Sequence, residues 1–198
     1  MINIFPLARS KRVKSISDAL KLHGKDNIIV QEYISGISCH VIAKEKEVKV
    51  FNRIGFDITK KIKNKEFYKD LSSIALQENE FHFLAIIKAN NIVVYDCLSL
   101  GKKKFANKNL LYRIDAMNSL SGDLKNISLI KTFNISNLDD LIDLNPKKIV
   151  FKFKNSKYPI KNLRSKEPIA KWYTFALTNK LYRDVIVDSF YTGSKKSD

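Results

Sequence analysis

The chain has 198 residues, of which 44% are hydrophobic and 11% aromatic, so it is long and apolar enough to bury the core of one domain. Six glycines and four prolines are too few for a linker or a disordered tail, and no apolar run approaches the ~20 residues of a membrane helix. The 36 Lys and Arg against 20 Asp and Glu leave a net charge of +16, which favours polyanionic partners such as DNA or RNA.

The first quarter of the chain predicts a helix followed by antiparallel strands. Ser15 to Leu22 is expected to form a short helix that ends before Gly24, and a strand opens at Asn27 to Val30. Polar and apolar side chains alternate from Ser38 to Ala43, and Val48 to Asn52 returns after a charged turn. This pattern predicts a β-hairpin.

A second helix and a second hairpin come next. Lys61 to Gln77 has helical periodicity, with one apolar face that contains Phe67, Leu71, Ile74 and Ala75. Phe81 to Lys88 and Ile92 to Leu98 then predict two paired strands that turn at Asn90 and Asn91.

The second half of the chain predicts an amphipathic helix and a series of short elements. The helix spans Asn109 to Leu120 and is expected to bury Leu110, Leu111, Ile114 and Leu120. The elements expected after it are a strand at Ile127 to Phe133, a helix at Leu138 to Leu144, a buried strand at Ile149 to Lys154, and strands at Lys171 to Leu177 and Asp184 to Phe190.

Hairpins with interspersed helices indicate an α+β fold with two packed, mostly antiparallel sheets and flanking helices. No repeat or linker divides the chain, so residues 1–190 are expected to form one domain, followed by a polar tail at 191–198. Cys39 and Cys97 lack metal-ligand spacing and predict reduced core thiols in an intracellular, reducing compartment such as cytoplasm, nucleoid or a phage- or virus-infected cell. His23, His40 and His82 are scattered and predict no metal site.

An ordered set of motifs carries a resemblance to a known family. Gln31 to Gly36 reads Gln-Glu-Tyr-Ile-Ser-Gly, Phe51 to Thr59 follows the pattern Phe-x-Arg-x-Gly-x-Asp-x-Thr, and Val94 to Leu98 reads Val-Tyr-Asp-Cys-Leu. Lys147 to Lys152 and Ala170 to Trp172 complete the set. In order, spacing and flanks, these segments resemble the adenylation domain of ATP-dependent DNA ligases, whose superfamily also contains mRNA-capping guanylyltransferases. ATP-grasp proteins share a similar early strand pair but lack the later segments.

The resemblance implies two small antiparallel sheets around a nucleotide cleft, and it implies lost chemistry. In the family, the first motif supplies a lysine that takes AMP from ATP; Tyr33 stands at that position here, and only Gly36 remains, for the turn geometry. Apolar residues occupy Phe83 to Ile86, where the family has a carboxylate, so this wall of the cleft is expected to be core. Lys147 replaces a metal-binding glutamate, which opposes Mg²⁺ binding.

The resemblance also selects candidate site residues. The family's arginine near the nucleotide sugar and the nick falls on Arg53, its purine-stacking aromatic residue on Tyr95, and its phosphate-binding lysine on Lys152; a core role for Tyr95 and a solvated Arg53 remain open. The vestigial nucleotide site would comprise Gln31, Arg53, Tyr95, Lys152 and Lys171. The expected contacts to nucleic-acid phosphates are Arg53, Lys147, Lys148, Lys152, Lys157, Lys161 and Arg164.

The loss of the nucleophile and carboxylates, in a chain that stops where the family's oligonucleotide-binding barrel begins, predicts a catalytically inactive ligase-like domain. It would be a non-enzymatic subunit that binds DNA or RNA or scaffolds a larger complex, with no membrane partner and no required cofactor, although residual ATP and Mg²⁺ binding stays open. One alternative is an active nucleotidyltransferase with a displaced nucleophile or a partner-supplied barrel. Another is a protein-interaction subunit of a replication, repair or transcription complex.

Overall fold

A computed structural model describes residues 11–13, 28–45, 47–53, 55–62, 66–88, 91–120, 124–134, 149–155, 158 and 185–187. The predicted helices at Ser15 to Leu22 and Leu138 to Leu144 and the predicted strand at Lys171 to Leu177 lie outside these residues.

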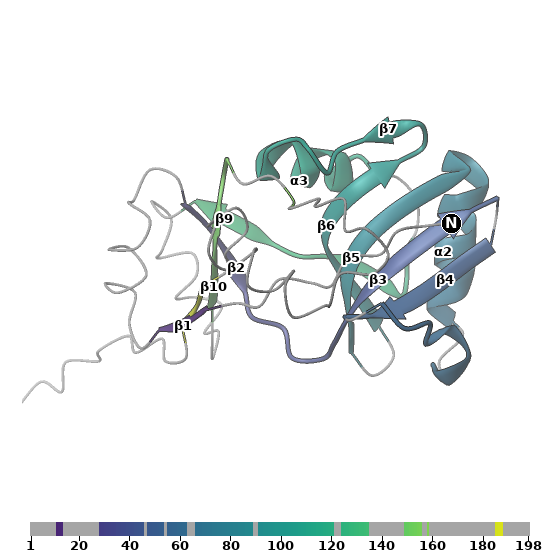
Figure 1. The fold of residues 1–198 in the computed structure, drawn as a ribbon, viewed down its shortest axis with the longest axis horizontal. Coiled ribbons are helices and arrows are strands. Elements are labelled where there is room, and N and C mark those ends of the chain that lie inside the picture. The colour runs from purple at the N-terminus through teal and green to yellow at the C-terminus, as the bar shows by residue number, and fades with distance from the viewer. Residues whose placement is uncertain are drawn as a thin grey trace, which may run out of the picture.

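Two β-sheets that stand side by side make up the fold (Figure 1). The larger sheet has the strand order β4-β3-β5-β6-β7, with β8 paired to β6. Its strands are β3 (Ile37–Lys44), β4 (Glu47–Asn52), β5 (Glu80–Lys88), β6 (Asn91–Leu100), β7 (Lys103–Lys104) and β8 (Ile127–Leu129). The smaller sheet has the order β1-β11-β10-β2-β9. Its strands are β1 (Lys11–Val13), β2 (Ile28–Glu32), β9 (Thr132–Asn134), β10 (Ile149–Phe153) and β11 (Val185–Val187).

Both predicted hairpins of the larger sheet are confirmed. β3 pairs antiparallel with β4 on one side and with β5 on the other, and β5 pairs antiparallel with β6. The helix α2 (Glu66–Glu78) lies on one face of this sheet and buries Phe67, Leu71, Ile74 and Ala75, which are the four residues that its apolar periodicity predicts. The helix begins at Glu66 rather than Lys61, because residues Thr59–Lys61 form a separate 3₁₀ turn, η1.

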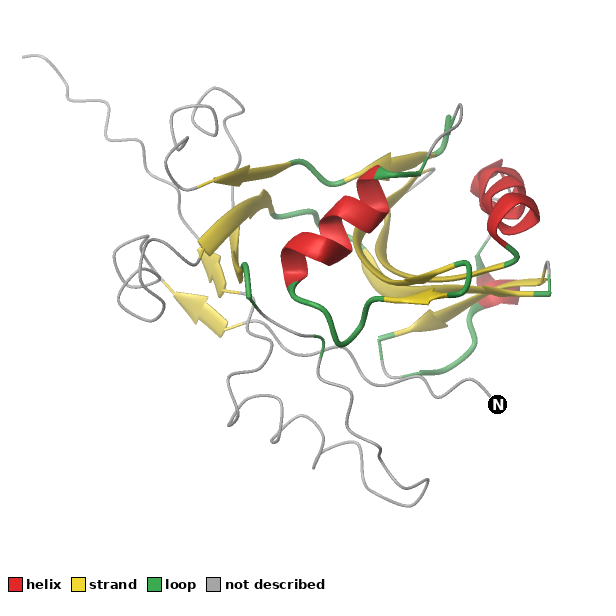
Figure 2. Cartoon of the chain, turned by 90° about the horizontal axis from the view of Figure 1, so that it is seen from above, coloured by secondary structure: helices red, strands yellow, loops and turns green. Residues whose placement is uncertain are grey.

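The helix α3 (Leu110–Asn118) spans the junction between the two sheets (Figure 2). Its Leu110 and Ile114 pack on Ile29 of β2, whereas Met117 belongs to the core of the larger sheet. The side chain of Asn109 caps the helix by accepting a hydrogen bond from Tyr112 N at 3.1 Å.

One predicted residue of the buried face of α3 is wrong. Leu111 is 40% exposed, whereas Arg113 is fully buried. The guanidinium of Arg113 turns inward to meet a carboxylate of β6, so the interior face of the helix runs through Leu110, Arg113, Ile114 and Met117.

The single strand predicted at Ile127 to Phe133 is also wrong. β8 pairs in parallel with β6 of the larger sheet, whereas β9 pairs antiparallel with β2 of the smaller sheet. Between them the Ile130 amide donates to Val94 O at 2.9 Å. The chain crosses from one sheet to the other here because each half finds a different partner for its backbone hydrogen bonds.

A buried ion pair joins α3 to β6. Arg113 Nε donates to Asp96 Oδ1 at 2.8 Å and Nη2 donates to Oδ2 at 3.2 Å, and both side chains are inaccessible to solvent. The third arm, Nη1, donates to the Lys108 carbonyl at 2.7 Å, just before the helix begins. This planar fork fixes the helix at two points with one side chain.

The two cysteines are free, buried thiols, as predicted. Burial raises the pKa of Cys39 to about 12 and also raises the pKa of Cys97, so both are thiols at neutral pH. Of the helices in the described part of the chain, none is long and apolar enough to span a membrane.

Replacing Arg113 with Met is expected to lower the free energy of unfolding by about 3 to 5 kcal/mol, because the Asp96 carboxylate is then buried without the guanidinium. Urea denaturation measures this loss. The control is Lys104→Met, which breaks the exposed 2.8 Å pair with Glu80 and should cost less than about 1 kcal/mol. Equal losses in the two variants would contradict the role given to the buried pair.

Candidate functional site

One face of the smaller sheet is turned toward the larger sheet. Ile29 stands opposite Lys152 and Gln31 stands opposite both Val150 and Thr132, so these side chains share a face of the sheet. Because Ile29 packs against α3, this shared face is the one that looks across the junction.

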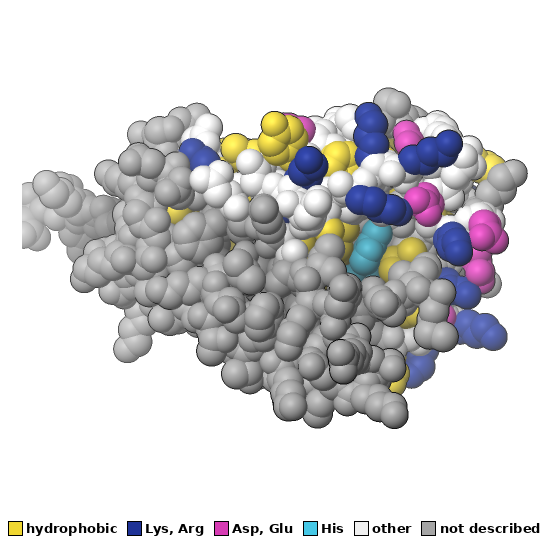
Figure 3. Space-filling model, turned by 45° about the horizontal axis from the view of Figure 1, so that its top comes forward, with side chains coloured by type: hydrophobic (Ala, Val, Ile, Leu, Met, Phe, Trp, Pro, Cys, Tyr) yellow, Lys and Arg dark blue, Asp and Glu magenta, His cyan; other side chains and the backbone are white. Residues whose placement is uncertain are grey.

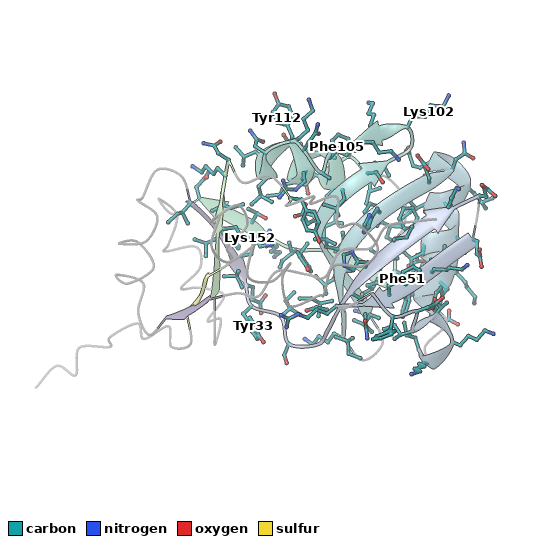
Figure 4. All side chains as sticks on the ribbon, in the orientation of Figure 1. Tyr33, Phe51, Lys102, Phe105, Tyr112 and Lys152 are labelled. Carbon is teal, nitrogen blue, oxygen red and sulfur yellow. The ribbon has the colours of Figure 1, made fainter. Side chains whose placement is uncertain are left out.

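Lys152 and Tyr95 meet at the junction of the sheets. The Lys152 Nζ atom lies 4.5 Å from the centre of the Tyr95 ring, at cation–π distance, and the lysine is only 4% exposed (Figure 4). The two residues come from motifs far apart in the chain, and both are predicted members of the nucleotide site. One face of the ring that the resemblance assigns to purine stacking is therefore covered by the protein's own ammonium group.

A β-bulge places Tyr95 at this point. Leu84 of β5 pairs with Asp96 and Ala85 pairs with Val94, which leaves Tyr95 as the extra residue on β6. A bulge bends its strand and re-aims the side chain of the unpaired residue. Tyr95 also packs against the cluster that contains Leu98 and Tyr158, so its ring contacts both the core and Lys152.

Gln31 brings a buried acceptor to the same face. Its Nε2 donates to Thr132 Oγ1 at 3.0 Å, and the side chain is buried. Its Oε1 atom has no hydrogen-bond partner among the described residues. A buried acceptor without a donor costs free energy.

Tyr33 lies on the link between β2 and β3, and its side chain is half-buried. Gly36, three residues later, has no room for a side chain. A Cβ atom there would lie 2.4 Å from the Ile87 carbonyl oxygen and 2.6 Å from Ile86 Cγ2. The turn geometry expected of Gly36 is thus a close approach of the link to β5.

The segment from Phe51 to Thr59 folds into a tight return against β4. Gly55 has φ of +94°, which explains the glycine of the motif. The Asp57 carboxylate accepts a hydrogen bond from the Thr59 amide at 2.8 Å, and the Thr59 hydroxyl accepts one from the Val50 amide at 2.8 Å. Hydrogen bonding to Thr59 lowers the pKa of Asp57. Arg53 is half-buried at the start of this return.

The wall of the larger sheet that would hold a family carboxylate is core, as predicted. Phe83, Leu84 and Ala85 are fully buried on β5, and Ile86 is half-buried. In the described ranges no three His, Cys, Asp or Glu side chains gather into a group that could hold a metal ion.

Several predicted contacts cannot be placed. The residues that lie outside the described part are Lys147, Lys148, Lys157, Lys161, Arg164 and Lys171, so their roles remain predictions. Lys152 also stays a predicted phosphate contact, and the structure adds that its ammonium group is inside the molecule.

The sequence patterns do not predict one side-chain pair in the larger sheet. His40 Nδ1 lies 2.9 Å from His82 Nε2, and the rings are 5.2 Å apart. His40 pairs with Leu84 and His82 with Ile42, so the two rings meet on a diagonal between β3 and β5. Finding the pair from sequence requires the register of two strands that are not consecutive in the chain. Burial, with smaller effects of His40 and Lys104, lowers the pKa of His82 to about 3.

No sequence-family model matches the chain, and no curated protein matches it in sequence. Solved structures match it in fold. A mycobacterial DNA ligase D complexed with ATP superposes with a TM-score of 0.55 at 11% identity, over 76% of this chain and 56% of that chain. An archaeal ATP-dependent RNA ligase gives a TM-score of 0.52 at 14% identity, over 76% and 45%. A Lig E DNA ligase gives 0.50 at 9% identity, over 80% and 65%.

The chain therefore has the fold of a ligase nucleotidyltransferase domain, and the predicted α+β architecture of mostly antiparallel sheets is confirmed. It spans less than two thirds of the length of each of these ligases. At such identities the likeness is one of fold.

The lowered pKa of His82 predicts an acid-dependent loss of stability. Below its ordinary pKa of about 6.5 the unfolded chain binds a proton that the folded chain excludes. This contribution is therefore fully present above about pH 6.5 and is lost as the pH falls toward 3, by up to about 1.4 kcal/mol per pH unit. Urea denaturation at pH 7, 6 and 5 measures the slope.

His82→Gln is expected to flatten that slope. The matched variant His40→Gln leaves the half-buried His82 in place and removes only a smaller cause of its lowered pKa, so it should retain most of the slope. A parent-like slope in His82→Gln would show that another group causes the acid sensitivity.

Proposed function

We propose that this protein is a ligase-like domain that binds nucleic acid without transferring a nucleotide, as a non-enzymatic binding or scaffolding subunit. The observation that supports the proposal most strongly is the Lys152 ammonium over the Tyr95 ring. A purine could stack on that face only after the lysine moved, and the move would separate a buried cation from its aromatic partner.

The chemistry of the first motif argues in the same direction. A nucleotidyl lysine forms a phosphoramidate through its amine, and the side chain at this position, Tyr33, carries a hydroxyl instead. The wall that would offer a carboxylate to metal and ribose is the buried apolar strand around Leu84. Two of the groups that the reaction needs are thus replaced by residues of different chemistry.

The charge of the chain supports a polyanionic partner. The net charge is +16, and the structural neighbours include a DNA ligase and an RNA ligase. On the described part of the face in Figure 3, basic side chains are scattered with acidic ones among them rather than gathered in one patch. The proposal therefore places the main phosphate contacts in the basic stretch from Lys147 to Arg164.

Binding to DNA and RNA should weaken steeply with salt, because each phosphate contact releases counterions. Replacing Lys147 and Lys148 together with Ala is expected to reduce the slope of log K against log salt by about 1 to 2. The control is Lys69→Ala, an exposed lysine on α2 that pairs with Glu66 at 3.2 Å. Fluorescence anisotropy with nicked duplex, intact duplex and single strands, from low to high salt, measures the slopes.

Affinity that ignores salt would refute the phosphate mechanism. Absence of binding to every nucleic acid would refute the proposed function and favour a protein-interaction subunit. Co-purification after nuclease treatment would then identify that role by a retained protein partner.

A second candidate function is supported by one observation. The buried Gln31 Oε1 atom has no donor among the described residues, and the exocyclic amino group of a base could supply one. Lys152 is an amine in the same junction, so an active nucleotidyltransferase with a displaced nucleophile would use this residue.

Labelling with radioactive ATP or GTP separates the two candidates. We expect no covalent label with Mg²⁺ or Mn²⁺, because the nucleophile position holds Tyr33 and Lys152 is engaged with Tyr95. A label that acid removes would indicate a phosphoramidate on a lysine, and its loss in Lys152→Arg would assign it. An acid-stable label would point instead to the hydroxyl of Tyr33, which Tyr33→Phe would abolish.

A further inference from the structure

Phe56 is a large aromatic residue that the fold leaves in solvent. It is 65% exposed, and it belongs to none of the hydrophobic clusters formed by the described residues. It lies in the return after β4, directly behind Gly55 and ahead of η1. Burying a phenylalanine is worth about 1.5 to 3 kcal/mol, so an exposed one contributes little to folding.

The return holds Phe56 rigidly. The Asn52 amide donates to the Phe56 carbonyl at 2.8 Å, and the Asn52 Oδ1 atom accepts from the Phe56 amide at 3.0 Å. The Gly55 amide donates to the Asn52 carbonyl at 3.0 Å. Both backbone groups of Phe56 are therefore tied to one residue of β4, and the ring is presented on an ordered turn.

Other residues of this return make the contacts that hold it against β4 and α2. Asp57 and Phe51 form an isolated antiparallel β-bridge, and the Ile58 amide donates to the Val50 carbonyl at 2.8 Å. The Tyr68 hydroxyl donates to the Thr59 carbonyl at 3.2 Å. These bonds cover the edge of β4, which would otherwise expose unpaired backbone groups. The ring of Phe56 takes part in none of them.

Exposed lysines follow Phe56 closely in the chain. Lys60 and Lys61 are exposed on η1, and the described residues offer neither of them an ion-pair partner. Lys49 and Lys60 also lie close enough to Asp57 to lower its pKa. Asp57, the next residue in the chain, accepts a hydrogen bond from the Thr59 amide, so its charge is already engaged within the turn.

We propose that Phe56 stacks on an unpaired base of a nucleic-acid strand while Lys60 and Lys61 contact the flanking phosphates. An exposed aromatic ring beside basic side chains is the arrangement by which proteins bind single strands without reading sequence. Base stacking needs an open ring face on a rigid support, and the turn offers both. The inference rests on the proposed nucleic-acid-binding function and adds a single-strand contact to it.

An apolar pocket of a protein partner is the competing occupant. Such a pocket would have to desolvate Lys60 and Lys61 along with the ring, which is costly for ammonium groups. A nucleic-acid strand instead supplies a base that can stack on Phe56 and phosphates that can pair with the lysine ammonium groups.

The test uses the full chain and measures affinity by anisotropy at constant salt. The ligands are a single DNA strand, an RNA strand of the same sequence, an abasic DNA strand and a blunt duplex. Phe56→Ala is expected to weaken binding of the base-containing strands by roughly 5- to 100-fold, and Phe56→Trp is expected to restore it. The control is Leu76→Ala on α2, which is 61% exposed and should bind as the parent does. On the abasic strand and the blunt duplex, parent and Phe56→Ala should bind equally.

The outcomes separate this inference from the function on which it rests. If the parent binds but Phe56→Ala binds single strands equally well, the stacking role is wrong and the proposed function stands. If Phe56→Ala loses affinity for abasic and base-containing strands alike, stacking is also wrong, because no base is involved. If the parent binds no nucleic acid, both proposals fail together. Weaker binding of DNA than of RNA, or the reverse, identifies which strand the turn takes.

Discussion

The buried pair between Asp96 and Arg113 is the constraint on which the junction of the two sheets depends. It anchors α3 to β6, and α3 in turn supports Ile29 of the smaller sheet with Leu110 and Ile114. Tyr95 is the immediate neighbour of Asp96 on β6, so the residue that meets Lys152 stands next to the residue that holds the helix. A charged pair without solvent contact stabilises only when both partners are in place, which makes the geometry of this region close to all-or-none.

The same junction holds the contact on which the proposed loss of nucleotide binding rests. Lys152 on β10 reaches across to the ring of Tyr95 on β6, and this cation–π contact offsets part of the cost of burying its ammonium group. The bulge that aims Tyr95 and the buried strand through Leu84 both belong to the sheet itself. Backbone pairing and apolar burial hold this scaffold together, so the fold by itself does not fix the chemistry of the groups that line the junction.

In the return after β4, most of the motif residues have a structural role, and Phe56 is exposed. Gly55, Asp57 and Thr59 are accounted for by the turn they build, through a positive φ and side-chain hydrogen bonds to the backbone. A motif that resembles part of a ligase site is thus, in this protein, first a folding signal that protects an edge strand. Phe56 is the residue of the return that folding does not use, and a residue that the fold holds rigidly in solvent is where an interaction is most economically placed.

Local pattern in the sequence determined the fold class, both hairpins of the larger sheet, the buried face of α2 and the core position of the cysteines. These features follow from side-chain periodicity and turn residues, which act over a few positions. The split of Ile127 to Phe133 into β8 and β9, the inward turn of Arg113, the diagonal meeting of His40 with His82 and the contact of Lys152 with Tyr95 were decided only by the tertiary structure. Each depends on the register between segments 17 to 105 residues apart, or on which sheet a strand joins, and no local pattern carries that information. Sequence motifs nominated both Tyr95 and Lys152 for one site, whereas their contact and the burial of the lysine required the packing of one sheet against the other.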